Sequence, residues 1–342
     1  FQNVSLNNAI HESGFFKNNY FPMGSGDSGQ ALGSALYLHN KIKNKNRPFY
    51  LSPFLGPSFS DENIKSILES SRMVYNKEEN ISKKVARLIS SGNIIGFFQG
   101  RGEYGPRSLG NRSLLADPRK IEMKQKINQL LKKRDWFMPY APSVMEEYVE
   151  EYATYPTYSP YMQIAFSLHK SAQKKIPAGI HVDGSSRLHV VSKRDNPLYW
   201  DLLNEFRLIT GLPVLLNTSF NRHGIPTISD PKQAVEHLLD GCMDYLAISN
   251  FLISYQDNRK SKSYEIPKNS EKICLKLDSI KRLGIILSED LSKHEIDDYV
   301  LHLNKLLDIK LKFNSNTFII DGIELTTDKV VEYLSSKISN SI

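Results

Sequence analysis

Short apolar runs and apolar residues at helical spacing alternate through the middle of the chain. The apolar runs predict strands, and they lie at Ile94–Phe98, Leu188–Val191, Val214–Leu216 and Tyr245–Ile248. The helical spacing predicts helices at 81–89, 119–133, 196–210 and 231–240. This alternation is typical of an α/β fold, in which loops at the strand ends present the ligand site.

The segments on either side of this block predict smaller units. Residues 1–75 begin in a pattern typical of a strand and contain a glycine-rich turn, Gly24–Gly29, before a helix pattern. Because the chain starts inside an element, we expect a fragment whose N-terminal part is missing. A polar stretch at 257–270 predicts a linker. The domains we expect are therefore 1–75, 80–256 and 257–342.

The last segment shows short elements but no chemistry that we can name. Strand patterns at 284–287 and Thr317–Ile320 flank a helix pattern near 295–307. The pair Asp321-Gly322 predicts a hairpin turn. We expect a small α/β extension of unknown role.

The composition is typical of a globular protein, and the net charge favours anionic ligands. Its 342 residues are 40% hydrophobic and 24% charged, and the net charge is +7. A basic balance suits anionic substrates, although most of the excess is dispersed lysine, which argues against a nucleic-acid surface. The two cysteines, Cys242 and Cys274, suggest neither a metal site nor a disulfide framework. No apolar run is as long as a membrane span, so we expect a cytoplasmic protein.

The densest chemistry follows the first predicted strand of the middle block. Residues 99–119 hold four arginines and four glycines. Arginine offers a planar fork of donors to phosphate or carboxylate oxygens, and glycine lets backbone N–H groups approach a ligand. The spacing matches neither a Walker A loop nor a dinucleotide fingerprint. Because a helix and a strand frame the segment, we favour a polyanion site over a flexible basic loop.

Two further polar clusters follow predicted strands or turns. Residues 217–221 carry two amides and two hydroxyls that could bind a phosphate, a ribose or a carbonyl, or could form an ordinary turn. In the cluster 181–187, Arg187 could add a second phosphate fork. His181 could act in acid–base chemistry, although a lone histidine is more often structural. No nucleophile triad stands out, which favours electrostatic stabilisation of a polyanion.

Two other features leave alternatives open. Asp27, in the glycine-rich turn, could ligate a metal or cap the following helix, and its spacing favours capping. The proline–aromatic segment Arg134–Ser143 could wall a base or sugar pocket, or pack in the core.

The arginine-rich segment resembles a motif of the NodU/CmcH family of O-carbamoyltransferases. Gly100–Ser113 and Ala116–Arg119 are similar to the family's Gly-Arg-x-Glu-x-Gly-Pro-Arg-x-Leu-Gly-x-Arg-Ser and Ala-Asp-Pro-Arg elements. The order of later landmarks also agrees over about residues 1–255, namely Tyr140–Val144, His181–Arg187, Leu215–Asn221 and Gly241–Asn250. Met138 departs from the family, because a basic residue is expected there.

The resemblance implies a two-part enzyme. A YrdC-like domain, with a twisted mixed sheet and helices, would join carbamoyl phosphate and ATP into carbamoyl-adenylate and release pyrophosphate. An actin/hexokinase-like domain would then pass the carbamoyl group to a hydroxyl of a sugar or secondary metabolite. Residues 1–75 would be the end of that domain. Asp27 would ligate iron or another divalent metal together with two histidines of the missing part, and Mg²⁺ would accompany ATP.

These considerations give a set of predicted site residues. The predicted catalytic residues are Arg101, Arg107, Arg112 and Ser219. The predicted substrate-binding residues are Glu103, Asn111, Ser113, Arg119, His181, Arg187, Asn217, Thr218 and Asn221. The alternatives are a nucleotide- or RNA-binding YrdC-like module without transfer activity and a threonylcarbamoyl-adenylate synthase. The concentration of arginines in one loop disfavours the former, and the element at 107–113 disfavours the latter.

Overall fold

The computed structural model describes residues 2–43, 52–128, 140–222 and 224–259, together with short stretches between 311 and 334. Contacts between residues divide the chain into two compact units, 1–261 and 262–342. The first unit includes both 1–75 and 80–256, so a boundary near residue 75 stays a prediction.

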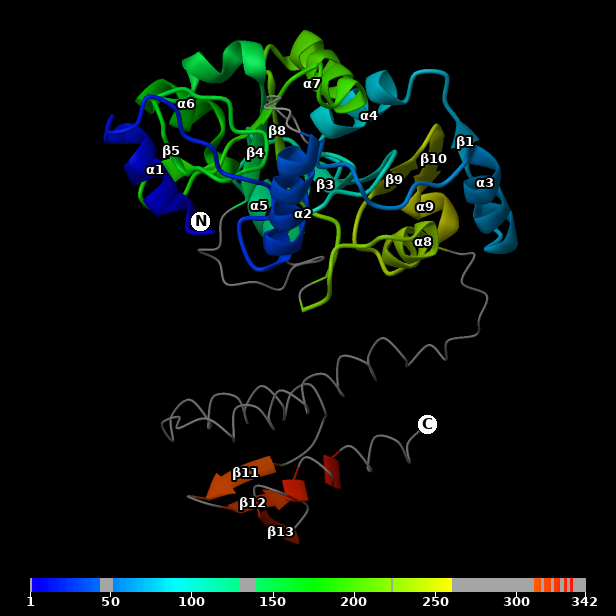
Figure 1. Ribbon diagram of the computed structural model, residues 1–342. Coiled ribbons are helices and arrows are strands. Elements are labelled where there is room, and N and C mark those ends of the chain that lie inside the picture. Colours follow the sequence, from blue (N-terminus) through cyan, green and yellow to red (C-terminus); the bar gives the residue numbers. More distant parts are fainter. Residues whose placement is uncertain are drawn as a thin grey trace. The chain divides into compact units, whose positions relative to one another are not determined.

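An eight-stranded sheet forms the centre of the first unit (Figure 1). Its strands, in sheet order, are β1 (Asn76–Lys77), β10 (Phe251–Ser254), β9 (Tyr245–Ile248), β2 (Ile95–Phe98), β3 (Arg112–Ala116), β8 (Val214–Ser219), β4 (Ala141–Met145) and β7 (His189–Val191). The sheet is mixed, because β2 pairs with β9 and β4 with β7 in parallel while the other pairs are antiparallel. The predicted α/β class with a large mixed sheet is confirmed.

The first unit also contains α-helices. They are α1 (Val4–Glu12), α2 (Ser28–Lys43), α3 (Asp61–Ser70), α4 (Ile81–Ser90), α5 (Glu122–Ile127), α6 (Lys170–Lys175), α7 (Pro197–Thr210), α8 (Pro231–Leu239) and α9 (Tyr255–Asn258). Three of the four helices predicted in the middle block are close to their observed bounds. The helix predicted at 119–133 is described as α5, and residues 129–139, with Met138, lie outside the described residues.

Successive residues of the central strands enter opposite cores, as the two-residue period of a strand requires. Phe97 packs in one core with α4 and α7, whereas Phe98 packs in the other with α3, α5 and α8. Leu115 and Leu114 divide in the same way. The sheet is therefore buried on both faces, which is why its strands read as continuous apolar runs. Figure 1 shows α4 and α7 together on one side and α8 on the other.

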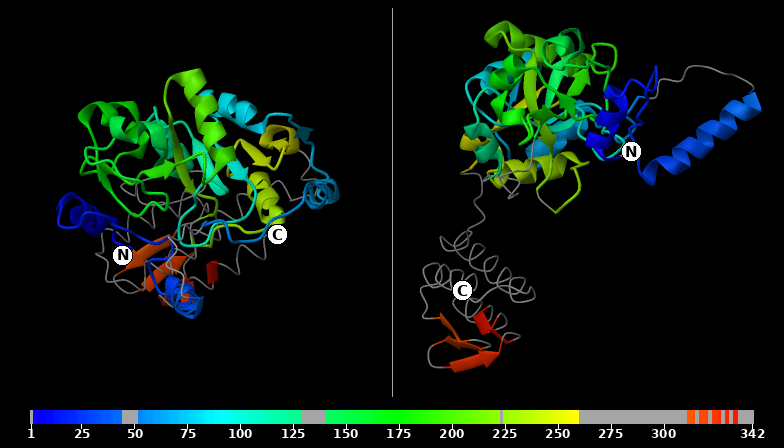
Figure 2. Two further views of the ribbon diagram at one scale, coloured as in Figure 1. Left: turned by 45° about the horizontal axis from the view of Figure 1, so that its top comes forward. Right: turned by 90° about the vertical axis from the view of Figure 1, so that its left-hand side faces the viewer.

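The N-terminal segment differs from its prediction. The strand expected at the start of the chain is wrong, because Val4–Glu12 form α1. The side chain of Asn3 caps this helix by accepting hydrogen bonds from the N–H groups of Ser5 and Leu6. The next helix, α2, has no buried residue and stands away from the rest of the unit in the right-hand view of Figure 2. No helix among the described residues combines the length and apolarity that crossing a membrane requires.

The described part of the second unit is a three-stranded antiparallel sheet. Its strands are β11 (Leu311–Asn314), β12 (Thr317–Ile320) and β13 (Ile323–Thr326). Ile320 of β12 pairs with Ile323 of β13 in antiparallel orientation, and the predicted turn residues Asp321-Gly322 lie outside the described residues. The strand and helix predicted at 284–287 and 295–307 lie outside the described residues.

Candidate functional site

Strand pairing brings the separate polar clusters to one end of the sheet. The arginine-rich loop connects β2 to β3, and Phe98 pairs with Arg112 where the loop closes. The end of β8 lies beside the start of β3, because Ser113 pairs with Ser219. Asn217 in turn pairs with Ala141, the first residue of β4. Three segments that are remote in sequence thus meet at one end of the sheet.

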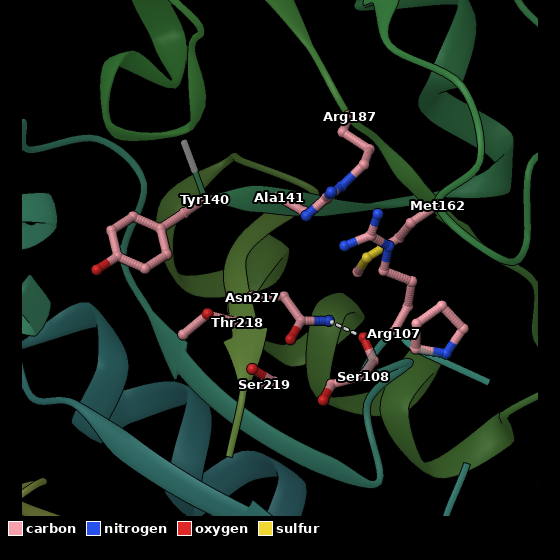
Figure 3. Close-up of a pocket in the computed structure, with 10 residues that line it drawn as sticks. Arg107, Ser108, Tyr140, Ala141, Met162, Arg187, Asn217, Thr218 and Ser219 are labelled. Atoms are coloured by element: carbon pink, nitrogen blue, oxygen red, sulfur yellow. Dashed lines mark hydrogen bonds between the residues drawn. The ribbon is translucent and has the colours of Figure 1, made fainter. Parts of the chain in front are cut away.

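A small pocket of about 70 Å³ opens at this edge (Figure 3). A volume of this size corresponds to a few water molecules, since each takes about 30 Å³ in the liquid. The lining residues are Pro106, Arg107, Ser108, Tyr140, Ala141, Met162, Arg187, Asn217, Thr218 and Ser219. Five of the predicted site residues are among them: Arg107, Arg187, Asn217, Thr218 and Ser219.

Two guanidinium groups reach the pocket from opposite directions. Arg107 comes from the β2–β3 loop, and Arg187 precedes β7, which pairs in parallel with β4. In Figure 3 both side chains point into the space above Asn217. Convergent arginine forks favour a phosphate or carboxylate ligand.

A buried hydrogen-bond chain lies under Asn217. Its Nδ2 donates to the carbonyl of Ser108 and to Oγ of Ser143, each at 3.1 Å. Ser143 Oγ lies 3.0 Å from Nδ1 of His189, whose burial lowers its pKa to about 3. Because the neutral imidazole nitrogen can accept, the serine hydroxyl can donate to it. Sequence reasoning missed Ser143 and His189 as supports of the site, since nothing in their local sequence distinguishes them from other strand residues.

The loop that carries Arg107 is held by one carboxylate. Glu103 Oε1 accepts the backbone N–H groups of Leu109 and Asn111, both at 2.8 Å, and that of Arg112 at 3.0 Å. Gly110, at a φ of +105°, packs so close to the ring of Tyr199 that an added Cβ would lie 2.4 Å from it. Through its three backbone hydrogen bonds, Glu103 fixes the conformation of the loop at residues 109–112.

Arg112, a predicted catalytic residue, is enclosed by other parts of the protein. Its side chain is buried at 1% exposure, and its guanidinium carbon lies 3.6 Å from the centre of the Phe98 ring. Nη1 donates to the carbonyls of Gln99 and Asn111, and Nη2 donates to those of Pro57 and Gly100. Burial lowers the pKa of Arg112 to about 10, against the opposing effect of Glu103. Nη1 and Nη2 are thus directed at carbonyls, Nε has no partner among the described residues, and the side chain lies outside the pocket lining. In this arrangement Arg112 contacts the loop rather than the pocket.

The other predicted residues of this region also make contacts within the protein. Arg101 donates to the carbonyls of Gly56 and Leu55, and Arg119 is paired with Asp117. Asn111 donates to the carbonyl of Arg101, and the hydroxyl of Ser113 accepts the N–H of Gly110. None of these four predicted residues belongs to the lining of the pocket as the structure describes it.

His181 and Asn221 do not belong to the lining of the pocket as the structure describes it. His181 Nδ1 is 2.9 Å from the hydroxyl of Ser185. Burial lowers the pKa of His181, Asp183 opposes the shift, and Arg187 adds to it. Asn221 Oδ1 accepts the hydroxyl of Ser219 at 2.5 Å, which ties the end of β8 to the turn that follows.

Asp27 does not form a metal site with the residues described here. It is exposed, and its Oδ1 lies 3.3 Å from Nε2 of Gln30. No group of three or more histidine, cysteine, aspartate or glutamate side chains in the described ranges could hold an ion. A catalytic metal needs about three protein ligands, so these residues alone do not fit the metal that the resemblance implies.

Comparison with known proteins agrees with the motif. Residues 86–255 match the family model described as carbamoyltransferase C-terminus. Nodulation protein NolNO of Sinorhizobium fredii is 36% identical over 73% of this chain and 38% of its own length. Nodulation protein NolO of Bradyrhizobium diazoefficiens is 35% identical over 73% of this chain and 47% of its own length. The chain thus spans less than half of these relatives.

Among solved structures, HypF of T. kodakarensis is similar, with a TM-score of 0.35 and 20% identity. The match covers 51% of this chain and 21% of that protein.

We predict that Arg112→Met lowers the free energy of unfolding by about 2 kcal/mol or more, because a buried group left unsatisfied costs about 1–3 kcal/mol. The carbonyls of Gln99 and Gly100 lose the Arg112 donors, whereas those of Pro57 and Asn111 keep the backbone N–H groups of Gly102 and Gln99. Denaturant titration measures the loss. Arg101→Met is the matched control, since its side chain is exposed, and it should cost less than about 1 kcal/mol. Equal losses in the two variants would contradict the structural role of Arg112.

Proposed function

Because residues 86–255 belong to the carbamoyltransferase C-terminus family, we propose that the pocket between Arg107 and Arg187 binds carbamoyl phosphate and that this chain is the adenylate-forming part of an ATP-dependent O-carbamoyltransferase. The observation that carries the proposal is the convergence of Arg107 and Arg187 with Thr218 and Ser219 on one small pocket. Two cationic forks suit a doubly charged phosphate, and the hydroxyls can complete its hydrogen bonds.

The overall chemistry balances with water as a reactant. Carbamoyl phosphate gives up inorganic phosphate, ATP gives up pyrophosphate, and a carbamate oxygen becomes bonded to the α-phosphorus of ATP. The chain would contribute by positioning and by neutralising charge, since the described pocket lining includes no cysteine, histidine or carboxylate. Arg107 and Arg187 would hold phosphate oxygens, and Ser219 and Asn221 would approach the adenylate from the end of β8.

Transfer to an acceptor hydroxyl is the second half of the proposal. We assign it to the longer protein that the relatives represent, because this chain spans less than half of their length. Asp27 would contribute one ligand to a divalent metal there, and the remaining ligands would come from outside the described residues. The acceptor class stays a hydroxyl of a sugar or secondary metabolite.

We expect Arg107→Ala to weaken the binding of carbamoyl phosphate or ATP by about tenfold or more, because a hydrogen bond to a charged group contributes about 1.5–3 kcal/mol. Isothermal titration calorimetry with each ligand measures the effect. Arg87→Ala, which removes an exposed arginine on α4, should leave both affinities unchanged. Unchanged affinity of the Arg107 variant for both ligands would refute the assignment.

Ser219→Ala should slow the exchange of labelled pyrophosphate into ATP in the presence of carbamoyl phosphate, while the melting temperature stays nearly the same. The reason is that the hydroxyl lines the pocket at the end of β8, where an adenylate would lie. Ser229→Ala, an exposed serine before α8, is the control. If exchange is normal in the Ser219 variant, the segment 217–221 is only a structural turn.

A further inference from the structure

Two polar atoms at the base of the pocket have no hydrogen-bond partner among the described residues. They are Oγ of Ser108 and Oδ1 of Asn217, in side chains that are 4% and 0% exposed. Both residues line the pocket. A buried polar group without a partner is costly, so a ligand that offers hydrogen bonds to these two atoms would be favoured.

The orientation of the Asn217 amide follows from its neighbours. The backbone carbonyl of Ser108 can only accept a hydrogen bond, so the NH₂ group of Asn217 must face it. The same NH₂ group donates to Ser143, which lies against His189. Oδ1 is therefore the atom left over, and it can only accept. Figure 3 shows the amide with its nitrogen directed to Ser108.

The base of the pocket thus offers one acceptor and one hydroxyl, below two arginines. The complementary ligand has an anion at one end and, at the other, a small planar group that carries an N–H donor and a carbonyl acceptor. We propose that Asn217 and Ser108 recognise the carbamoyl group itself: its NH₂ donates to Asn217 Oδ1, and its C=O accepts from the Ser108 hydroxyl. This rests on the proposed function and deepens it, because it assigns substrate specificity to named atoms.

Acetyl phosphate distinguishes the contact to Asn217 from the contact to Ser108. It keeps the carbonyl and the phosphate of carbamoyl phosphate but carries a methyl group in place of NH₂. A site built to bond an N–H group discriminates against an analogue that lacks it. The wild-type chain should bind carbamoyl phosphate about tenfold or more tightly than acetyl phosphate. Inorganic phosphate, which contacts only the arginines, should bind more weakly than either.

The experiment is calorimetry of the full chain with these three ligands, in the presence of a non-hydrolysable ATP analogue. Ser108→Ala should weaken carbamoyl phosphate and acetyl phosphate by a similar factor and leave inorganic phosphate unchanged. Asn217→Val should bring carbamoyl phosphate and acetyl phosphate to within about twofold of each other. Ser82→Ala, a buried serine of α4 outside the pocket lining, should change none of the affinities.

The outcomes separate the inference from the function on which it rests. If the wild-type chain binds carbamoyl phosphate and acetyl phosphate equally well, the assignment of Asn217 is overturned while the phosphate site stands. If it binds none of the three ligands, the proposed function itself fails. Should Asn217→Val not fold, as its melting curve would show, the wild-type preference and the Ser108 variant still decide the matter. A Ser108 variant with unchanged affinity for all three ligands would overturn the role of the hydroxyl.

Discussion

The buried guanidinium of Arg112 is the constraint on which the site depends. It lies on the face of Phe98 and draws four carbonyls, from residues 57, 99, 100 and 111, around one cation. A buried charge is tolerable only when it is hydrogen-bonded. Since the four carbonyls have to meet at one point, the ends of the β2–β3 loop are closed against each other. Glu103 then gathers the N–H groups on the other side of the loop.

This closure restrains a glycine-rich loop. The glycines give the backbone the freedom to turn, and the Arg112 and Glu103 contacts remove that freedom again in the folded state. Arg107 therefore projects from a fixed base toward Arg187. The antiparallel pairing of β3, β8 and β4 adds the residues of the other wall at a set register. Positioning of this kind is one way in which an enzyme lowers a barrier.

Much of the fold could be predicted because its strands are buried on both faces and its helices are amphipathic. β2 and β9 stand out as apolar runs, and α7 has a proline at its start and Gly211 at its end. The helix at the N-terminus was missed because Val4, Leu6 and Ile10 are spaced in a way that fits a strand as well. Its decisive signal, the Asn3 cap, is local and weak.

The arginine motif does not predict the environment of each arginine in the candidate site. A pattern places arginines near a ligand, but it cannot separate an arginine that binds the ligand from one that holds the loop. Arg107 and Arg112 are five positions apart in the same motif, yet one lines the pocket and the other is enclosed by carbonyls. Burial distinguishes the two side chains, and burial is a property of the tertiary fold. The sequence also cannot show that the side chains of Ser108 and Asn217 each have a buried oxygen without a hydrogen-bond partner. That finding needs the positions of all neighbouring groups in the fold. Polar groups that form no hydrogen bond within the protein can determine the specificity of such a site. A ligand gains binding free energy when it forms the hydrogen bonds that these groups lack.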